Sequence, residues 1–112
     1  IGDCAGKIKA AGLLAKMEVN QGNGYPVWQP DLNSRLLKTA KTVYRELYGC
    51  DPEVKTIHAG LECGIIRDHF KGMDTLSFGP TMRSPHSPDE RLNIHTVQKF
   101  WVFLLQLLKS IK

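Results

Sequence analysis

The chain has 112 residues, which is enough for one small domain with a single hydrophobic core. Hydrophobic residues make up 42% of it and charged residues 23%, a composition that excludes a disordered chain and is ordinary for a globular protein. The net charge is +4, but the 15 basic residues are scattered rather than clustered with aromatic ones, so we expect no nucleic-acid partner.

Cysteine usage and hydropathy narrow the class of protein further. Cys4, Cys50 and Cys63 are odd in number and too widely spaced for a CxxC zinc site, so we expect reduced thiols in a cytoplasmic protein. The longest apolar stretch, near the C-terminal end, is interrupted by lysines and glutamines and is too polar to span a membrane. Because the sequence does not begin with Met, we expect part of a longer chain or a processed product.

The first part of the chain has the pattern of a helix followed by a strand. Asp3 can cap a helix over residues 3–11, which Gly12 would end. Apolar and polar residues then alternate from 13 to 20, a pattern typical of a strand with one wet face in an antiparallel sheet. The next segment, QGNGYPVWQPD, can continue neither element, and its aromatic residues predict an ordered crossing between two packing units.

From residue 31 onward the pattern predicts part of a parallel α/β layer. Asp31 is expected to open a helix that ends at Gly49, because apolar residues recur there at helical spacing. The short β-branched segment 54–59 predicts a strand, residues 60–70 a helix, and residues 73–80 a second strand. Strand, helix and strand with short connections indicate a βαβ unit with parallel pairing.

The last helix is predicted to begin at the motif SPDE. Ser87 would be its N-cap, Pro88 its first residue, and Glu90 would complete a capping box. On this interpretation His86 is only the residue outside the cap. The apolar stripe of this helix is so wide that it indicates a helix covering a sheet. The stripe consists of Val97, Trp101, Leu104, Leu108 and Ile111, and it is widened by Phe100, Phe103 and Leu107.

Two segments carry residues that could do chemistry, because sites in open α/β sheets form beyond the carboxyl ends of the strands. HAGLECG follows the first predicted strand and GPTMRSPHSPDE the second, so neighbouring strands would bring His58, Glu62 and His86 to one edge. A Cys63–His58 nucleophile pair is the alternative, although a thiol in the first turn of a helix is more often a buried structural one. These ligands are too few for a two-metal centre, and no HExxH or His-x-Asp motif occurs.

Three longer segments, in this order and spacing, carry a family resemblance: IHAGLECGII, MDTLSFGPTMRSPHSPDERLNI and VQKFWVFLLQLLK. Together with GYPVWQPD before the long helix, they resemble the C-terminal end of the aminoacyl-histidine dipeptidases, also called cytosolic non-specific dipeptidases. The resemblance covers residues 19–112 well and the first residues weakly.

The resemblance implies a two-domain metallopeptidase with a two-zinc centre that cleaves unblocked dipeptides of the Xaa-His type with a metal-activated water. It implies an α/β fold in which residues 1–22 are the last helix and strand of a ferredoxin-like lid (dimerisation-type) domain. Residues 23–112 would be the C-terminal part of the catalytic domain, a βαβ unit plus the C-terminal helix. In the family the His of HSPDE is a zinc ligand, which falls on His86. The HAGLECG turn lines the substrate side, which carries over to Gly60, Glu62 and His58.

The family's other metal ligands and its Glu-Glu pair with the general base have no counterpart in these 112 residues. The resemblance therefore implies no catalytic residue here and a chain that is inactive alone. The partners that it implies are a dipeptide substrate, the rest of the parent chain and a second copy in a homo-oligomer, with no nucleic acid and no membrane. A free-standing, non-catalytic α/β binding module with an acidic partner is the alternative.

Overall fold

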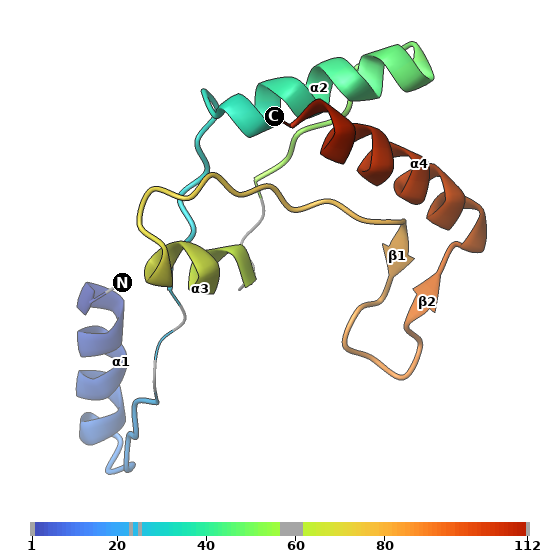
Figure 1. Cartoon of the computed structure of the whole chain (residues 1–112). Coiled ribbons are helices and arrows are strands. Elements are labelled where there is room, and N and C mark those ends of the chain that lie inside the picture. The colour runs from blue at the N-terminus through green and yellow to red at the C-terminus, as the bar shows by residue number, and fades with distance from the viewer. Residues whose placement is uncertain (1, 23, 25, 57–61, 112) are drawn as a thin grey trace.

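The computed structural model describes residues 2–22, 24, 26–56 and 62–111. This part of the chain contains four helices and one two-stranded antiparallel sheet (Figure 1). The helices and strands are α1 (Gly2–Leu14), α2 (Arg35–Tyr48), α3 (Glu62–His69), β1 (Met82–Arg83), β2 (Arg91–Leu92) and α4 (Ile94–Ser110). The described fold is therefore rich in helix rather than in strand.

The core lies where α2 packs against α4. Its buried hydrophobic residues, within the described part of the chain, are Ala40, Val43, Phe103 and Leu107. Two hydrogen bonds join the same helices at the surface, because Tyr48 Oη donates to the Lys99 carbonyl (2.7 Å) and Lys99 Nζ donates to Tyr44 Oη (2.8 Å). This helix pair is the part of the molecule that holds the other segments in place.

The ends of α2 are set by local chemistry. Gly49 ends the helix as predicted, in a left-handed conformation (φ 70°) that a residue without Cβ adopts at no cost. The start differs from the prediction, because Ser34 rather than Asp31 is the N-cap and its Oγ accepts from Leu37 N–H (2.9 Å). Asp31 instead accepts from Asn33 N–H (2.8 Å) and so closes the turn before the cap.

The strand predicted over residues 13–20 is wrong. The helix continues through Gly12 to Leu14, and the chain then turns at Lys16, which has a positive φ of 56°. The backbone folds back until Met17 N–H donates to the Gly12 carbonyl (2.8 Å), and a Cβ on Gly12 would overlap the side chain of Val19. Alternation predicts a strand only where another strand supplies backbone partners, and no such strand lies here in the described part of the chain.

The parallel βαβ unit is likewise absent from the described residues. Residues 53–56 and 74–79 are extended, but neither segment takes part in a ladder, while residues 57–59 lie outside the described part. The helix predicted between them is present as α3. The expected α/β class is therefore seen here only as helices joined by extended segments, because a parallel sheet needs neighbouring strands that the described part of this chain does not contribute.

The last helix also begins later than predicted. Its N-cap is Asn93, whose side chain accepts from His95 N–H (3.2 Å), so Ser87 does not cap it and β2 lies between the motif and the helix. The buried residues of α4 are Phe103 and Leu107, which belong to the part that widens the predicted stripe. Trp101, at the centre of that stripe, is 55% exposed.

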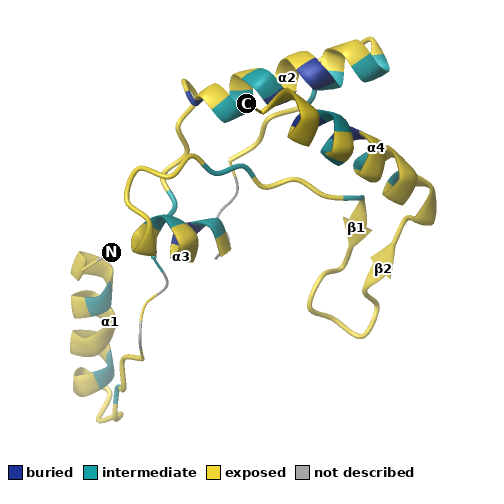
Figure 2. Ribbon diagram, viewed as in Figure 1, coloured by how far each residue is buried: buried dark blue, intermediate teal, exposed yellow. Residues whose placement is uncertain are grey.

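The molecule is open. Its radius of gyration is 18.9 Å, where a compact domain of this length has about 13 Å. Its accessible surface is 9568 Å², where a folded monomer of this mass exposes about 6,200 Å². Figure 2 shows exposed residues over most of α1, the β1–β2 hairpin and the outer side of α4. Among the described residues, no helix has the length and hydrophobicity that a membrane crossing requires.

Candidate functional site

The predicted zinc ligand lies at the tip of the β1–β2 hairpin, in the loop of residues 84–90 (Figure 1). Two hydrogen bonds tie the base of the hairpin to the first turn of α4. Asn93 N–H donates to the Thr81 carbonyl (2.9 Å), and Thr81 N–H donates to Thr96 Oγ1 (2.9 Å). The loop is therefore positioned by the helix that carries half of the core.

Side chains of the HSPDE motif close this loop from within. His86 N–H donates to Glu90 Oε2 (2.8 Å), and Asp89 N–H donates to Ser87 Oγ (3.2 Å). Ser87 Oγ in turn donates to the Ser84 carbonyl (2.9 Å). The contacts are of the capping-box type, but they satisfy the backbone of a hairpin loop instead of a helix end. The capping-box interpretation did not predict this role of Glu90, for which the signal in the sequence is its spacing of four residues from His86.

The backbone of His86 is held in a conformation that residues other than Gly rarely adopt. Its φ is 62°, and Ser84 in the same loop has a φ of 50°. Each such residue costs on the order of 1 kcal/mol, which the surrounding hydrogen bonds must offset. The side chain of His86 is exposed. The loop therefore fixes the backbone of His86 while its imidazole remains accessible to a ligand.

The described residues do not form a metal centre by themselves. Nowhere in residues 2–22, 24, 26–56 and 62–111 do three or more His, Cys, Asp or Glu residues gather in a way that could hold a metal ion. A zinc ion in a protein takes at least three protein ligands, and His86 can supply one ring nitrogen. The described residues therefore do not build a zinc site by themselves.

The predicted substrate residues lie at and before the start of α3. His58 and Gly60 fall outside the described residues, and Glu62 is the exposed first residue of α3. In Figure 1 α3 lies apart from the hairpin, and no contact joins the two, so the described structure does not bring Glu62 and His86 together.

Helix α3 packs instead against the segment 26–29. A Cβ on Gly64 would lie 2.7 Å from the Pro26 carbonyl oxygen, so this glycine permits the close approach of backbone to helix. Arg67 Nη1 donates to the Gln29 carbonyl (2.7 Å) on the next turn of the helix. Residues 26–29 of the predicted crossing therefore pack against α3 and position the helix that carries Glu62.

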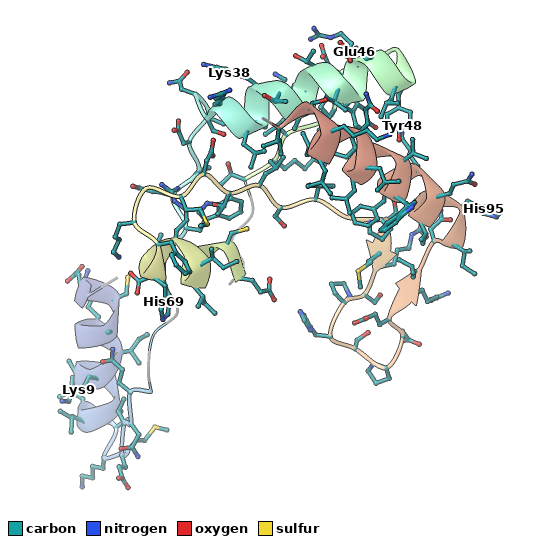
Figure 3. The ribbon with its side chains drawn as sticks, viewed as in Figure 1. Lys9, Lys38, Glu46, Tyr48, His69 and His95 are labelled. Carbon is teal, nitrogen blue, oxygen red and sulfur yellow. The ribbon has the colours of Figure 1, made fainter. Side chains whose placement is uncertain are left out.

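The thiol of Cys63 has the environment of a structural cysteine. Burial raises its pKa, and the neighbouring carboxylate of Glu62 raises it further, which outweighs the hydrogen bond with Thr75. A raised pKa keeps the thiol protonated and makes it a poor nucleophile. The other histidines of the described chain, His69 and His95, do not point toward the hairpin loop in Figure 3.

Comparison with known proteins confirms the resemblance. No family model matches the chain. The sequence is 40% identical over 104 residues to the cytosol non-specific dipeptidase of Escherichia coli (strain K12), which covers 93% of this chain and 21% of that protein. The fold is similar to the crystal structure of the aminoacylhistidine dipeptidase from Vibrio alginolyticus, with a TM-score of 0.75 and 39% identity. That match covers 99% of this chain and 23% of the other, so the chain spans about a fifth of the length of its relatives.

Proposed function

We propose that this chain is the C-terminal part of a cytoplasmic, zinc-dependent dipeptidase that hydrolyses unblocked dipeptides of the Xaa-His type. The observation that carries the proposal is the 40% identity, over 93% of the chain, to a protein named as a dipeptidase. The open structure supports it as well, because the chain leaves far more surface uncovered than a complete domain of its mass does.

Within that enzyme, His86 would be one zinc ligand and the hairpin loop its support. The hydrogen bond from His86 N–H to Glu90, together with the tie from Thr81 to Thr96, fixes the backbone from which the imidazole projects. Partners of this kind orient a ligand and tune its affinity for metal. When bound, zinc acts as a Lewis acid and lowers the pKa of a water molecule.

The remaining assignments concern substrate and domains. Gly60, Glu62 and His58 would line the substrate side, residues 1–22 would end the lid domain, and residues 23–112 would belong to the catalytic domain. The exposed position of Glu62 at the start of α3 is compatible with contact to a substrate. The chain contains no Glu-Glu pair to supply a general base, so it would contribute to catalysis only as part of the whole enzyme.

A chimera tests the proposal. In the Escherichia coli relative, this chain would replace the segment that it matches, and His86→Ala would be compared with His95→Ala as the control, since His95 is also exposed. We expect the unsubstituted chimera to hydrolyse a dipeptide ending in His. His86→Ala should lower both the zinc content and the rate, the latter by at least about tenfold, as losses in a zinc site do.

The two variants give separate outcomes. Full zinc content in the His86→Ala chimera would contradict the assignment of His86 as a ligand. A folded chimera that has no dipeptidase activity would contradict the proposed function itself. Equal losses in the His86→Ala and His95→Ala variants would point to a general effect on the fold and would also count against the assignment.

A further inference from the structure

The hairpin that carries His86 stands away from the helices. Figure 1 shows β1 and β2 projecting from the N-terminal end of α4, and in the described part of the chain no helix packs against either strand. Every residue of the two strands is exposed. The direction in which the hairpin points therefore depends on the contacts at its base, where the chain enters and leaves it.

Above that base the hairpin is one rigid unit. Its two strands pair in an antiparallel ladder, and the loop at its tip is closed by hydrogen bonds of its own. His86 N–H donates to Glu90 Oε2 (2.8 Å), and Ser87 Oγ donates to the Ser84 carbonyl (2.9 Å). A tilt of the hairpin at its base therefore carries His86 with it instead of being absorbed within the loop.

One side chain, the hydroxyl of Thr96, links both legs of the hairpin to α4. Thr96 Oγ1 accepts from Thr81 N–H (2.9 Å), on the residue before β1, and donates to the carbonyl of Asn93 (2.7 Å), the residue after β2. Asn93 N–H in turn donates to the Thr81 carbonyl (2.9 Å) and closes the base. A hydroxyl can accept and donate at once, which an aliphatic side chain at this position could not do.

The parts that Thr96 joins are themselves held in place. One turn along α4 from Thr96, the Lys99 carbonyl accepts from Tyr48 Oη of α2 (2.7 Å). On the segment that enters the hairpin, the ring of Phe78 lies 4.9 Å, centroid to centroid, from the buried ring of Phe103. The start of α4 and the approach to the hairpin are therefore anchored, and the contact at Thr96 sets the angle between them.

We propose that Thr96 is a positioning residue for the zinc ligand: its hydroxyl sets the angle of the hairpin on α4 and thereby the position of the His86 ring. The inference rests on the proposed function, in which His86 is a ligand, and adds the residue that aims it. Thr96 is not itself a ligand and acts only through the hairpin.

A small change of angle at the base has a large effect at the tip. His86 follows Thr81 by five residues, and five extended residues span at most about 16 Å. Over a lever of about that length, a tilt of about 4° moves the tip by about 1 Å. Distances from a metal to its protein ligands vary by only about 0.2 Å, so such a shift takes the ring nitrogen out of bonding range.

Removal of the hydroxyl in the chimera described above tests the inference. Thr96→Val exchanges the hydroxyl for a methyl group of similar size, and we expect the zinc affinity, measured by competition with a chelator, to fall at least about tenfold. With cobalt(II) in place of zinc, the visible absorption bands should shift, because they depend on ligand geometry. Thr96→Ser keeps the hydroxyl and should restore both properties. Thr96→Ala, which favours helix more than Thr does, repeats the deletion if Thr96→Val does not fold.

The matched control is Thr39→Val on α2. Thr39 is also a half-buried threonine of a helix, and its hydroxyl donates to the Arg35 carbonyl (3.0 Å), remote from the hairpin. Its substitution should leave the zinc affinity and the cobalt spectrum unchanged. Amide hydrogen exchange at Thr81 reports the contact directly, and we expect it to become at least about tenfold faster in Thr96→Val and to stay unchanged in Thr39→Val.

The outcomes separate this inference from the proposed function. Unchanged zinc affinity in Thr96→Val, together with a loss in His86→Ala, would overturn the inference and leave the function standing. A Thr96→Ser variant as weak as Thr96→Val, or an equal loss in Thr39→Val, would also overturn it, because the hydroxyl of Thr96 would not be the cause. Full zinc affinity in His86→Ala would instead remove the ligand, and the inference would fall with it.

Discussion

At the scale of single residues, Asp74 links two segments of the described chain. Its carboxylate accepts from the hydroxyl of the N-cap Ser34 and from Leu36 N–H, so one side chain joins the segment 74–79 to the start of α2. Burial by itself would raise the pKa of Asp74, but these hydrogen bonds, with help from Arg67, leave it below its ordinary value.

This lowered pKa predicts a pH dependence of stability. Because the folded-state pKa is below the unfolded one, the stabilisation is present above the ordinary carboxyl range near about 4 and is lost as the pH falls through the folded pKa. Asp74→Asn should lower the free energy of unfolding at neutral pH by about 1 kcal/mol and weaken its dependence on acid pH. Urea unfolding between neutral and acid pH measures the free energy of unfolding and its pH dependence. The control is Asp89→Asn, a substitution in the exposed hairpin loop. Identical pH profiles for wild type and Asp74→Asn would contradict the prediction.

At the scale of elements, α4 has two apolar sides with different surroundings. One side, with Phe103 and Leu107, is buried against α2. On the opposite side, Trp101 is 55% exposed and Leu108 is 57% exposed. Exposed apolar patches mark interaction surfaces, so we expect the rest of the proposed dipeptidase chain to cover the outer side of α4.

A matched pair of substitutions tests this division. In the isolated chain Phe103→Ala should lower the free energy of unfolding by about 3 kcal/mol, because it leaves a cavity in the core. Trp101→Ala should change that free energy by less than about 1 kcal/mol, because its side chain is already in solvent. In the chimera Trp101→Ala should become strongly destabilising, as measured by thermal unfolding. Little effect of Trp101→Ala in both contexts would mean that this side of α4 stays exposed.

At the scale of the whole molecule, the chain is open and exposes more surface than a compact monomer of its mass. Its core within the described residues is one cluster between two helices, and its accessible surface of 9568 Å² exceeds that of a folded monomer by about 3,400 Å². Burial of about 400 Å² of apolar surface is worth roughly 10 kcal/mol before association costs, which cancel much of it. Burial of exposed apolar surface therefore favours association of the isolated chain.

We expect self-association of the isolated chain at micromolar concentration. The outer side of α4 exposes large apolar side chains, so we expect the chains to associate through it. Trp101→Asp should therefore shift the equilibrium toward monomer, while the control His95→Asp on the same helix should not. Light scattering across a concentration series measures the mass. A strictly monomeric species that unfolds cooperatively would show that the exposed apolar surfaces do not drive association.

The isolated chain should also lack the activity proposed for the whole enzyme. One imidazole binds zinc weakly, because affinity comes from several preoriented ligands. Calorimetry with zinc should reveal no tight site, and assays with a dipeptide ending in His should detect no turnover. A stoichiometric zinc site that His86→Ala leaves unchanged would contradict the assignment of His86, and metal-dependent turnover by the pure chain would contradict the expected inactivity.

The sequence by itself determined those features that depend on short-range chemistry or on a long run of matching residues. Helical spacing and Gly49 predicted the body and the end of α2, because a left-handed residue after the last turn is a local requirement. The segments around HAGLECG and HSPDE led to the dipeptidase resemblance, which the comparisons confirm.

Only the tertiary structure decided what the ambiguous patterns become. SPDE makes the hydrogen bonds of a cap, and such bonds satisfy a hairpin loop as well as a helix end, so the pairing of β1 with β2 determined which of the two forms. Residues 53–56 and 74–79 have the composition of strands, but a strand needs backbone partners from a neighbour. Those partners are long-range, and in the described part of this chain no neighbouring segment provides them.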